Sequence, residues 1–270
     1  MIDFHVHIGN LRRDRYPHIP LSAPQWIDRM DRESIDLSVL LPLESPEGAH
    51  GYFTTEEACA ARDMYPERFV AFLCIDPRMP SPGPQIDHFV NHCGCMGFGE
   101  HINGLAFDDD RNRAVYAKCD EYGLPLVFEN NNDTPQLSAL ESCVKEFQNV
   151  TWVGHGPGFW AAISGDWDGS SGYPKGPIAG GGAVDRLLSR YENVFADLSA
   201  QSAYNAMTRD PGFAAEFIQR HWRRLLWGSD VFYQGQPIPQ LAWLRQLDLD
   251  AEIKQAIADG NARRLLGLSG

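Results

Sequence analysis

The chain opens with Met1-Ile2-Asp3-Phe4-His5-Val6-His7, an apolar stretch that ends in two histidines separated by one residue. Similar short runs rich in Val, Ile, Leu and Phe recur along the sequence, and the segments between them suit amphipathic helices. This alternation predicts parallel strands built from βα units. We predict eight strands, at residues 1–7, 36–43, 69–75, 94–101, 125–130, 151–155, 194–198 and 225–230. Eight units predict closure into one (β/α)₈ barrel, a TIM barrel of the α/β class, as a single domain over residues 1–270.

Length and charge narrow the class of protein. The chain has 270 residues and a formal net charge of −13. An acidic chain without a dense Lys/Arg stripe argues against nucleic-acid binding. No apolar run approaches the roughly 18 residues of a membrane-spanning helix. The first residues lack the basic start of a secretory signal, so we expect a cytoplasmic protein without membrane association. A homo-oligomer is compatible with a barrel, whose exterior can carry subunit contacts.

The six cysteines are scattered, which favours reduced thiols. Only Cys93-Gly94-Cys95 places two of them close together. Because this pair leads into a predicted strand, we do not expect it to bind metal or form a redox pair.

Several residues mark predicted helix ends. Thr54 is a candidate N-cap, Gly123 follows a helix at 110–122, and Pro135 could open a helix ending near Phe147. Residues 251–266 form a last amphipathic helix, which we expect on the barrel exterior.

The connection at 156–182 is far longer than its neighbours and is rich in Gly, Pro and aromatic residues. Because it follows the sixth strand, it should emerge on the active face of a barrel. Trp160, Trp167 and Tyr173 could line a substrate pocket there. The alternative is a packed loop without ligand contacts.

His5 and His7 point to the same side of a strand, close enough to share one metal ion. A lone His-x-His pair is a weak signal. However, His155 and Asp230 also end predicted strands, and barrel enzymes keep their active sites at the carboxyl ends of strands. Together these four residues predict a metal site.

The sequence resembles the amidohydrolase superfamily, in particular the subgroup related to aminocarboxymuconate semialdehyde decarboxylase. The resemblance spans almost the whole chain. It rests on Asp3-Phe4-His5-Val6-His7, Gly123-Leu124-Pro125-Leu126-Val127, Asn149-Val150-Thr151-Trp152-Val153-Gly154-His155, Leu225-Leu226-Trp227-Gly228-Ser229-Asp230 and Gly260-Asn261-Ala262-Arg263-Arg264-Leu265-Leu266.

The resemblance implies that His5, His7 and Asp230 bind a divalent metal ion. It implies that His155 binds a second ion or orients water and substrate, and that Asp230 is also the general base. A carboxylate beside water acidified by a metal can take its proton. Mixed nitrogen and oxygen ligands suit zinc, manganese or iron, of which we favour zinc.

Two glutamates complicate this picture. Family members commonly carry a histidine at the end of the fifth strand, where this chain has Glu129. Glu129 could be an oxygen ligand, which we favour, an acid or base, or the mark of a weakened site. Glu100 ends the fourth strand and resembles a metal-binding glutamate of TatD-like relatives; a surface carboxylate is the alternative. If Glu100, Glu129 and Asp230 share one cavity, their repulsion favours two ions over one.

We therefore expect a metal-dependent hydrolase that uses metal-activated water on an ester, lactone or amide of a small organic substrate. Arg12, Arg13 and Arg15, after the first strand, could meet an anionic substrate, with a solvated loop as the simpler alternative. A second reading is a non-oxidative decarboxylase in which one metal ion orients a carboxylic acid and Asp230 protonates carbon. A third reading is a barrel that has lost catalysis, for which Glu129 is the only support.

Overall fold

The computed structural model describes residues 1–14, 16–48, 51, 53–130 and 137–268. All eight predicted strands are present and pair in parallel, although most are shorter than predicted. The strands are β1 (Ile2–Val6), β2 (Leu37–Leu40), β3 (Phe69–Ala71), β4 (Phe98–His101), β5 (Pro125–Glu129), β6 (Thr151–His155), β7 (Val194–Asp197) and β8 (Leu225–Leu226).

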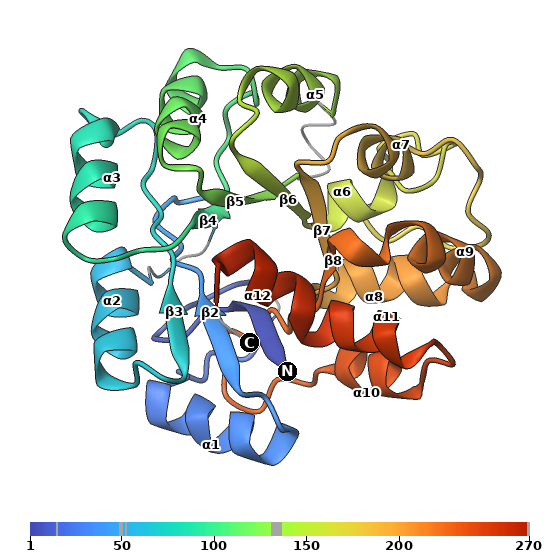
Figure 1. The fold of residues 1–270 in the computed structure, drawn as a ribbon, viewed down its shortest axis with the longest axis horizontal. Coiled ribbons are helices and arrows are strands. Elements are labelled where there is room, and N and C mark those ends of the chain that lie inside the picture. The colour runs from blue at the N-terminus through green and yellow to red at the C-terminus, as the bar shows by residue number, and fades with distance from the viewer. Residues whose placement is uncertain (15, 49–50, 52, 131–136, 269–270) are drawn as a thin grey trace.

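The strands close into a barrel. Continuous hydrogen bonding joins the strands into two groups, in the orders β1-β2-β3 and β4-β5-β6-β7-β8. Backbone hydrogen bonds join these two groups at both seams: the Leu73 amide donates to the Gly97 carbonyl at 2.9 Å, and the Phe4 amide donates to the Trp227 carbonyl at 3.0 Å. Figure 1 shows the resulting ring of strands with helices around its outside. The predicted (β/α)₈ fold is confirmed.

The helices follow the strands in alternation. They are α1 (Ala23–Glu33), α2 (Thr55–Met64), α3 (Pro82–Asn91), α4 (Asp110–Tyr122), α5 (Leu137–Glu146), α6 (Pro157–Ala161), α7 (Ala183–Arg190), α8 (Ala200–Thr208), α9 (Pro211–His221), the 3₁₀ turn η1 (Trp222–Arg224), α10 (Pro239–Gln246), α11 (Ala251–Gln255), the π-helical turn η2 (Ala256–Gly260) and α12 (Asn261–Leu266). Two predicted ends are confirmed, because Thr54 caps α2 and Gly123 ends α4 with a φ of 63°. Pro135 lies outside the described residues. None of the described helices is long and apolar enough to cross a membrane.

The last helix differs from its prediction in continuity and position. A π-helical turn divides residues 251–266, and α12 turns Ala262 and Leu266 into the apolar core inside the barrel. The amino group of Met1 lies 3.8 Å from Asp259, so this segment covers the end where the strands begin. It crosses the centre of the ring in Figure 1. The expectation of an exterior helix was wrong for α12, because its apolar side chains fill the opening of the barrel.

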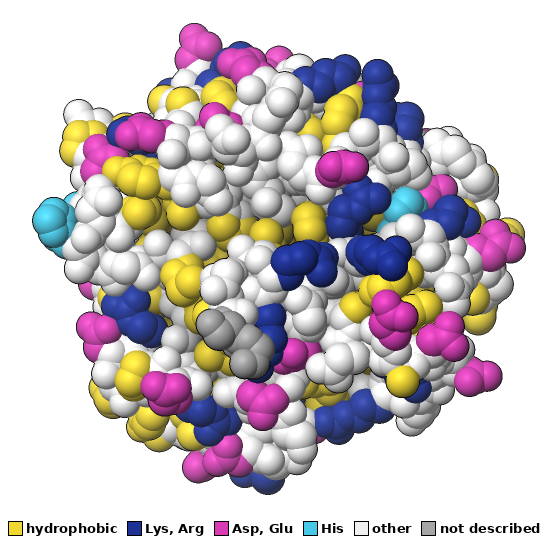
Figure 2. Space-filling model, viewed as in Figure 1, with side chains coloured by type: hydrophobic (Ala, Val, Ile, Leu, Met, Phe, Trp, Pro, Cys, Tyr) yellow, Lys and Arg dark blue, Asp and Glu magenta, His cyan; other side chains and the backbone are white. Residues whose placement is uncertain are grey.

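Side chains of both charges occur across this end of the molecule, as Figure 2 shows. The predicted site lies at the other end, where the strands finish.

Candidate metal centre and active site

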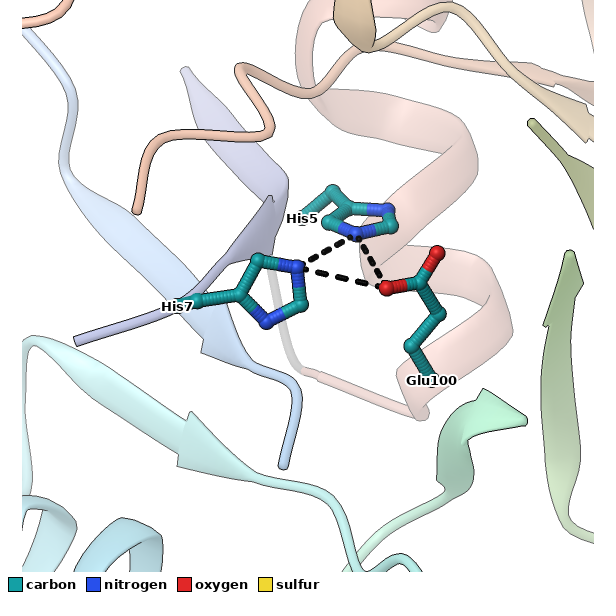
Figure 3. A group of neighbouring side chains, drawn as sticks. All are labelled: His5, His7 and Glu100. Atoms are coloured by element: carbon teal, nitrogen blue, oxygen red, sulfur yellow. Dashed lines mark hydrogen bonds and ion pairs between the residues drawn. The ribbon is translucent and has the colours of Figure 1, made fainter. Parts of the chain in front are cut away.

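The two histidines of β1 face the same interior point, as predicted. Ile2 and Phe4 pack in the core inside the barrel, whereas Val6 packs in the core outside it. The pairing of β1 with β2 is irregular between Asp3 and Val6, which interrupts the alternation of inward and outward side chains along β1. As a result, His5 and His7 both turn inward. Their Nε2 atoms lie 3.1 Å apart, and Figure 3 shows both aimed at the carboxylate of Glu100.

The hydrogen bonds of the two imidazoles fix which nitrogen carries the proton. His7 Nδ1 lies 2.7 Å from the carbonyl oxygen of Leu41, and His5 Nδ1 lies 2.6 Å from Oδ2 of Asp197. Both partners can only accept, so each Nδ1 donates. In the neutral imidazoles, Nε2 then carries a lone pair. Two lone pairs directed at one point are the arrangement that histidine ligands present to a metal ion.

Two carboxylates complete this cluster. Glu100 Oε2 and Asp230 Oδ1 each lie 3.4 Å from His7 Nε2 and 3.7 Å from His5 Nε2. Both oxygens of Glu100 and Oδ1 of Asp230 are buried without a hydrogen-bond partner among the described residues. Burial opposes ionisation, but hydrogen bonds from His5 and His7 and the charges of His155 and His5, when these imidazoles are protonated, outweigh it and hold the pKa of Glu100 well below its usual value. Buried anionic oxygens without donors call for a cation.

The spacing of these four donor atoms fits one ion. Ligands held about 2.0–2.2 Å from a metal in tetrahedral geometry lie about 3.3–3.6 Å from one another. The Nε2 atoms of His5 and His7 lie 3.1 Å apart, and each lies 3.4 or 3.7 Å from Oε2 of Glu100 and from Oδ1 of Asp230. The residues present therefore fit a divalent cation.

A second set of ligand atoms adjoins the first through Glu100. His155 Nε2 lies 3.4 Å from Oε1 of Glu100, and Glu129 groups with these two residues closely enough to hold an ion. Burial and the charge of Glu100 raise the pKa of Glu129 to about 7. The structure thus brings together all six predicted ligands, from β1, β4, β5, β6 and the segment after β8.

Asp197 and Ser199 belong to this cluster and were not predicted. Asp197 Oδ2 lies 3.3 Å from His155 Nδ1 as well as against His5, and Ser199 Oγ lies 3.0 Å from the same His155 nitrogen. The Ser199 amide donates to Asp197 Oδ1 at 2.9 Å. Asp197 is the last residue of β7, so the rule that pointed to His155 and Asp230 could also have found it.

A cavity of about 320 Å³ adjoins the cluster at the carboxyl ends of the strands. It is bounded by charged and aromatic side chains, which include Arg13, Tyr16, Glu129, His155, Tyr173, Asp230, Phe232 and Tyr233. Its size suits a small organic molecule. Of the four predicted substrate contacts, only Tyr173 lines it.

Arg13, not Arg12, reaches this cavity. Its Nε donates to the Gly48 carbonyl at 3.1 Å, its guanidinium lies 5.1 Å from the ring centre of Phe232, and its Nη2 lies 3.6 Å from Glu100 Oε2. Arg12 is exposed and does not line the cavity, while Arg15 lies outside the described residues. The sequence pointed to this segment but could not distinguish its arginines, because an irregular loop has no periodicity that indicates side-chain direction.

The two tryptophans of the 156–182 connection also differ from expectation. Trp160 lies in α6, is fully buried, and donates its indole N–H to the Asp197 carbonyl at 3.0 Å. Trp167 is half-buried, and its indole donates to the Ser171 carbonyl at 2.8 Å. Neither lines the cavity. Their indoles support the loop from within, and Trp160 also supports the backbone of Asp197.

A comparison with protein families identifies the family of the chain. The family model described as amidohydrolase matches residues 2–268. The chain belongs to the amidohydrolase family. The search of curated proteins found no match to the chain.

Solved structures share the amidohydrolase's fold along its whole length. One is 2,6-dihydroxybenzoate decarboxylase from Rhizobium, 16% identical with a TM-score of 0.64, covering 100% of this chain and 99% of that one. Another is a probable 2-pyrone-4,6-dicarboxylic acid hydrolase from Acinetobacter baumannii, 15% identical with a TM-score of 0.67, covering 98% of each chain. A third is a dihydroxybenzoic acid decarboxylase from Polaromonas with bound manganese and 2-nitroresorcinol, 16% identical with a TM-score of 0.64, covering 99% of this chain and 96% of that one. The chain is therefore an enzyme of the amidohydrolase family and shares the fold of these structures.

Proposed function

We propose that this enzyme is a metal-dependent, non-oxidative decarboxylase of a small aromatic or conjugated carboxylic acid. The observation that carries the proposal is the compact cluster of His5, His7, Glu100 and Asp230 beside a cavity walled by aromatic rings: each histidine Nε2 lies 3.1 to 3.7 Å from the other Nε2 and from an oxygen of both carboxylates. One ion is enough to neutralise the two carboxylates of this set. Two of the structures described above are decarboxylases of dihydroxybenzoic acids.

The residues have distinct roles in this proposal. A divalent ion held by His5, His7, Glu100 and Asp230 would supply positive charge that orients the carboxylated substrate. Arg13 would bind an anionic group of the substrate, and Tyr173 would pack against its ring. His155, held by Ser199 and Asp197, would position the substrate from the β6 side.

Asp230 is suited to handle the proton. It borders both the donor set and the cavity, and its pKa is lowered because the nearby histidines and Arg13 outweigh the effect of burial. In the proposed step, Asp230 takes a proton from solvent and delivers it to the carbon that bears the carboxylate. The carbon–carbon bond then breaks, its electron pair restores the conjugated system, and carbon dioxide leaves.

Hydrolysis is the second candidate. It is favoured by Glu129, a third carboxylate that groups with Glu100 and His155, and by the hydrolase from Acinetobacter baumannii. A second ion between these residues would suit the attack of water on a carbonyl carbon.

Metal counting and product analysis separate the candidates. We would load the protein with manganese or zinc, count the ions by elemental analysis, and use a His5→Ala/His7→Ala variant as the control. The loaded protein would be incubated with 2,6-dihydroxybenzoate and with 2-pyrone-4,6-dicarboxylate. We expect one ion per chain, lost in the double variant, and release of carbon dioxide. Two ions and ring opening of the pyrone without carbon dioxide would overturn decarboxylation.

Glu129→His tests the idea of a barrel without catalysis. If Glu129 marks a weakened site, histidine should restore metal affinity. We expect instead that metal binding does not improve, because the four donors of the first set do not include Glu129. A variant that binds metal much more tightly than an inactive wild type would favour the degenerate barrel.

A further inference from the structure

Three thiols gather outside the active site, where α2 meets the segment that leads into β4. The Sγ atoms of Cys59 and Cys95 lie 3.5 Å apart. Cys93 also interacts with Cys59, and its Sγ lies 3.7 Å from Nε2 of His88. Arg62 holds this segment by donating to the carbonyl oxygen of Cys93 at 2.8 Å.

We propose that Cys59 and Cys95 are a site of reversible oxidation, at which a peroxide converts the two thiols to a disulfide. A disulfide has a bond length of about 2.0 Å, so the sulfurs need to approach by about 1.5 Å. The resulting bond would link α2 to the strand segment that continues to Glu100. The proposal does not depend on the substrate of the enzyme.

The two thiols have unequal roles. A hydrogen bond from Cys95 and the positive charge of Arg62 lower the pKa of Cys59 to about 7 against the opposing effect of burial, whereas the pKa of Cys95 is raised. Cys59 is therefore the thiolate that attacks the peroxide, and Cys95 is the resolving thiol that then attacks the oxidised Cys59 sulfur. Cys59 is 8% exposed, while Cys119 and Cys143 are fully buried.

The chemistry balances with peroxide as the oxidant. The Cys59 thiolate attacks one oxygen of hydrogen peroxide, becomes a sulfenic acid and releases hydroxide. The Cys95 sulfur then attacks the Cys59 sulfur, and the sulfenic hydroxyl leaves with the Cys95 proton as water. Two thiols lose two electrons, and one peroxide is reduced to two waters.

A metal site at this position is less consistent with the geometry. Within the described ranges, the groups of three ligand atoms close enough to hold an ion all lie at the active site, and none includes a cysteine. The sulfurs of Cys59 and Cys95, 3.5 Å apart, are instead placed for direct bonding.

The test begins with the wild-type protein, so that it does not depend on a variant folding. We would treat it with hydrogen peroxide and determine its intact mass and its linked peptides. We expect loss of two hydrogens, a peptide joining Cys59 to Cys95, and reversal by dithiothreitol. Retention of all thiols, or a dominant Cys59–Cys93 link, would overturn the proposal.

Two variants check the assignment. Cys95→Ser should abolish the linked peptide and leave Cys59 as a sulfenic acid that dimedone traps. Cys143→Ser is the matched control, because the Cys143 thiol donates to the Phe107 carbonyl at 3.5 Å, away from the other thiols, and this variant should oxidise like the wild type. A disulfide at Cys59 that persists at the wild-type level in Cys95→Ser would also overturn the pairing.

Discussion

Oδ2 of Asp197 lies 2.6 Å from Nδ1 of His5, and the same oxygen lies 3.3 Å from Nδ1 of His155. One carboxylate at the end of β7 therefore orients imidazoles from β1 and β6. By accepting the proton of His5 Nδ1, it leaves Nε2 of His5 free to bind a cation, and its charge also lies beside Nδ1 of His155. Asp197 itself is fully buried, and His5 and His155 hold its pKa below the usual value although burial opposes this.

Asp197→Asn should weaken metal binding. A neutral amide neither stabilises the imidazoles electrostatically nor fixes their tautomer, and such substitutions cost about 10–100-fold in metal affinity. Titration calorimetry with manganese or zinc would measure the change. The matched control is Asp185→Asn, because Asp185 Oδ1 lies 2.6 Å from Nε2 of His221 on α9, away from the donor atoms of the site. Equal affinities for wild type and Asp197→Asn would contradict the positioning role.

The sequence supported the prediction of the barrel and of its candidate metal ligands because both follow a regular pattern. Apolar runs mark strands, and a polar residue at the end of an apolar run lies on the active face. His5, His7, His155 and Asp230 follow this rule, and so does Asp197, to which we did not apply it. The rule predicts where a residue lies along its strand, but it does not predict which side chains that residue contacts.

Side chains in irregular segments could not be predicted in this way. Arg12 and Arg13 are adjacent, and only loop geometry decides that Arg13 faces the cavity. Trp160 sits in a connection whose composition favours a surface loop, yet a short helix buries it. The direction in which a side chain points in an irregular segment depends on its tertiary contacts.

Arg13→Met should weaken the binding of an anionic ligand. A hydrogen bond to a charged group contributes about 1.5–3 kcal/mol, which corresponds to about a 10–100-fold change in affinity. The measurement is the Kd of 2,6-dihydroxybenzoate, with metal content determined in parallel because Arg13 also lies 3.6 Å from Glu100. Arg12→Met is the control, since Arg12 is exposed. If Arg12→Met weakened binding as much as Arg13→Met, the assignment of Arg13 would be wrong.

Leu266→Ala should destabilise the fold through the barrel opening that α12 closes. Leu266 is 5% exposed and packs in the core inside the barrel. Truncation of a buried leucine costs about 2–5 kcal/mol. Urea denaturation would measure the free energy of unfolding, and Leu265→Ala, at a half-buried position on the same helix, should cost less. A larger loss for Leu265→Ala would show that α12 packs differently.

The reactivity of Cys59 should depend on pH near neutrality. Cys95 lowers the pKa of Cys59 by hydrogen bonding, burial opposes this, and the charges of Arg62 and Asp63 on α2 act in opposite directions, which leaves the pKa at about 7. A hydrogen bond from Cys93 also lowers the pKa of Cys59. Because the thiolate is the nucleophile, the alkylation rate should rise with pH up to about 7 and level off above it.

Mass-spectrometric mapping of iodoacetamide labelling across a pH series would measure this rate at each cysteine. In Cys95→Ala the hydrogen bond to Cys59 is lost, so the midpoint of labelling should move upward toward the usual thiol pKa of about 8.5. Cys143 serves as the internal reference, because burial raises its pKa and its labelling should remain slow near neutral pH. A midpoint for Cys59 that does not move in Cys95→Ala would mean that Arg62, rather than Cys95, sets the reactivity of this thiol.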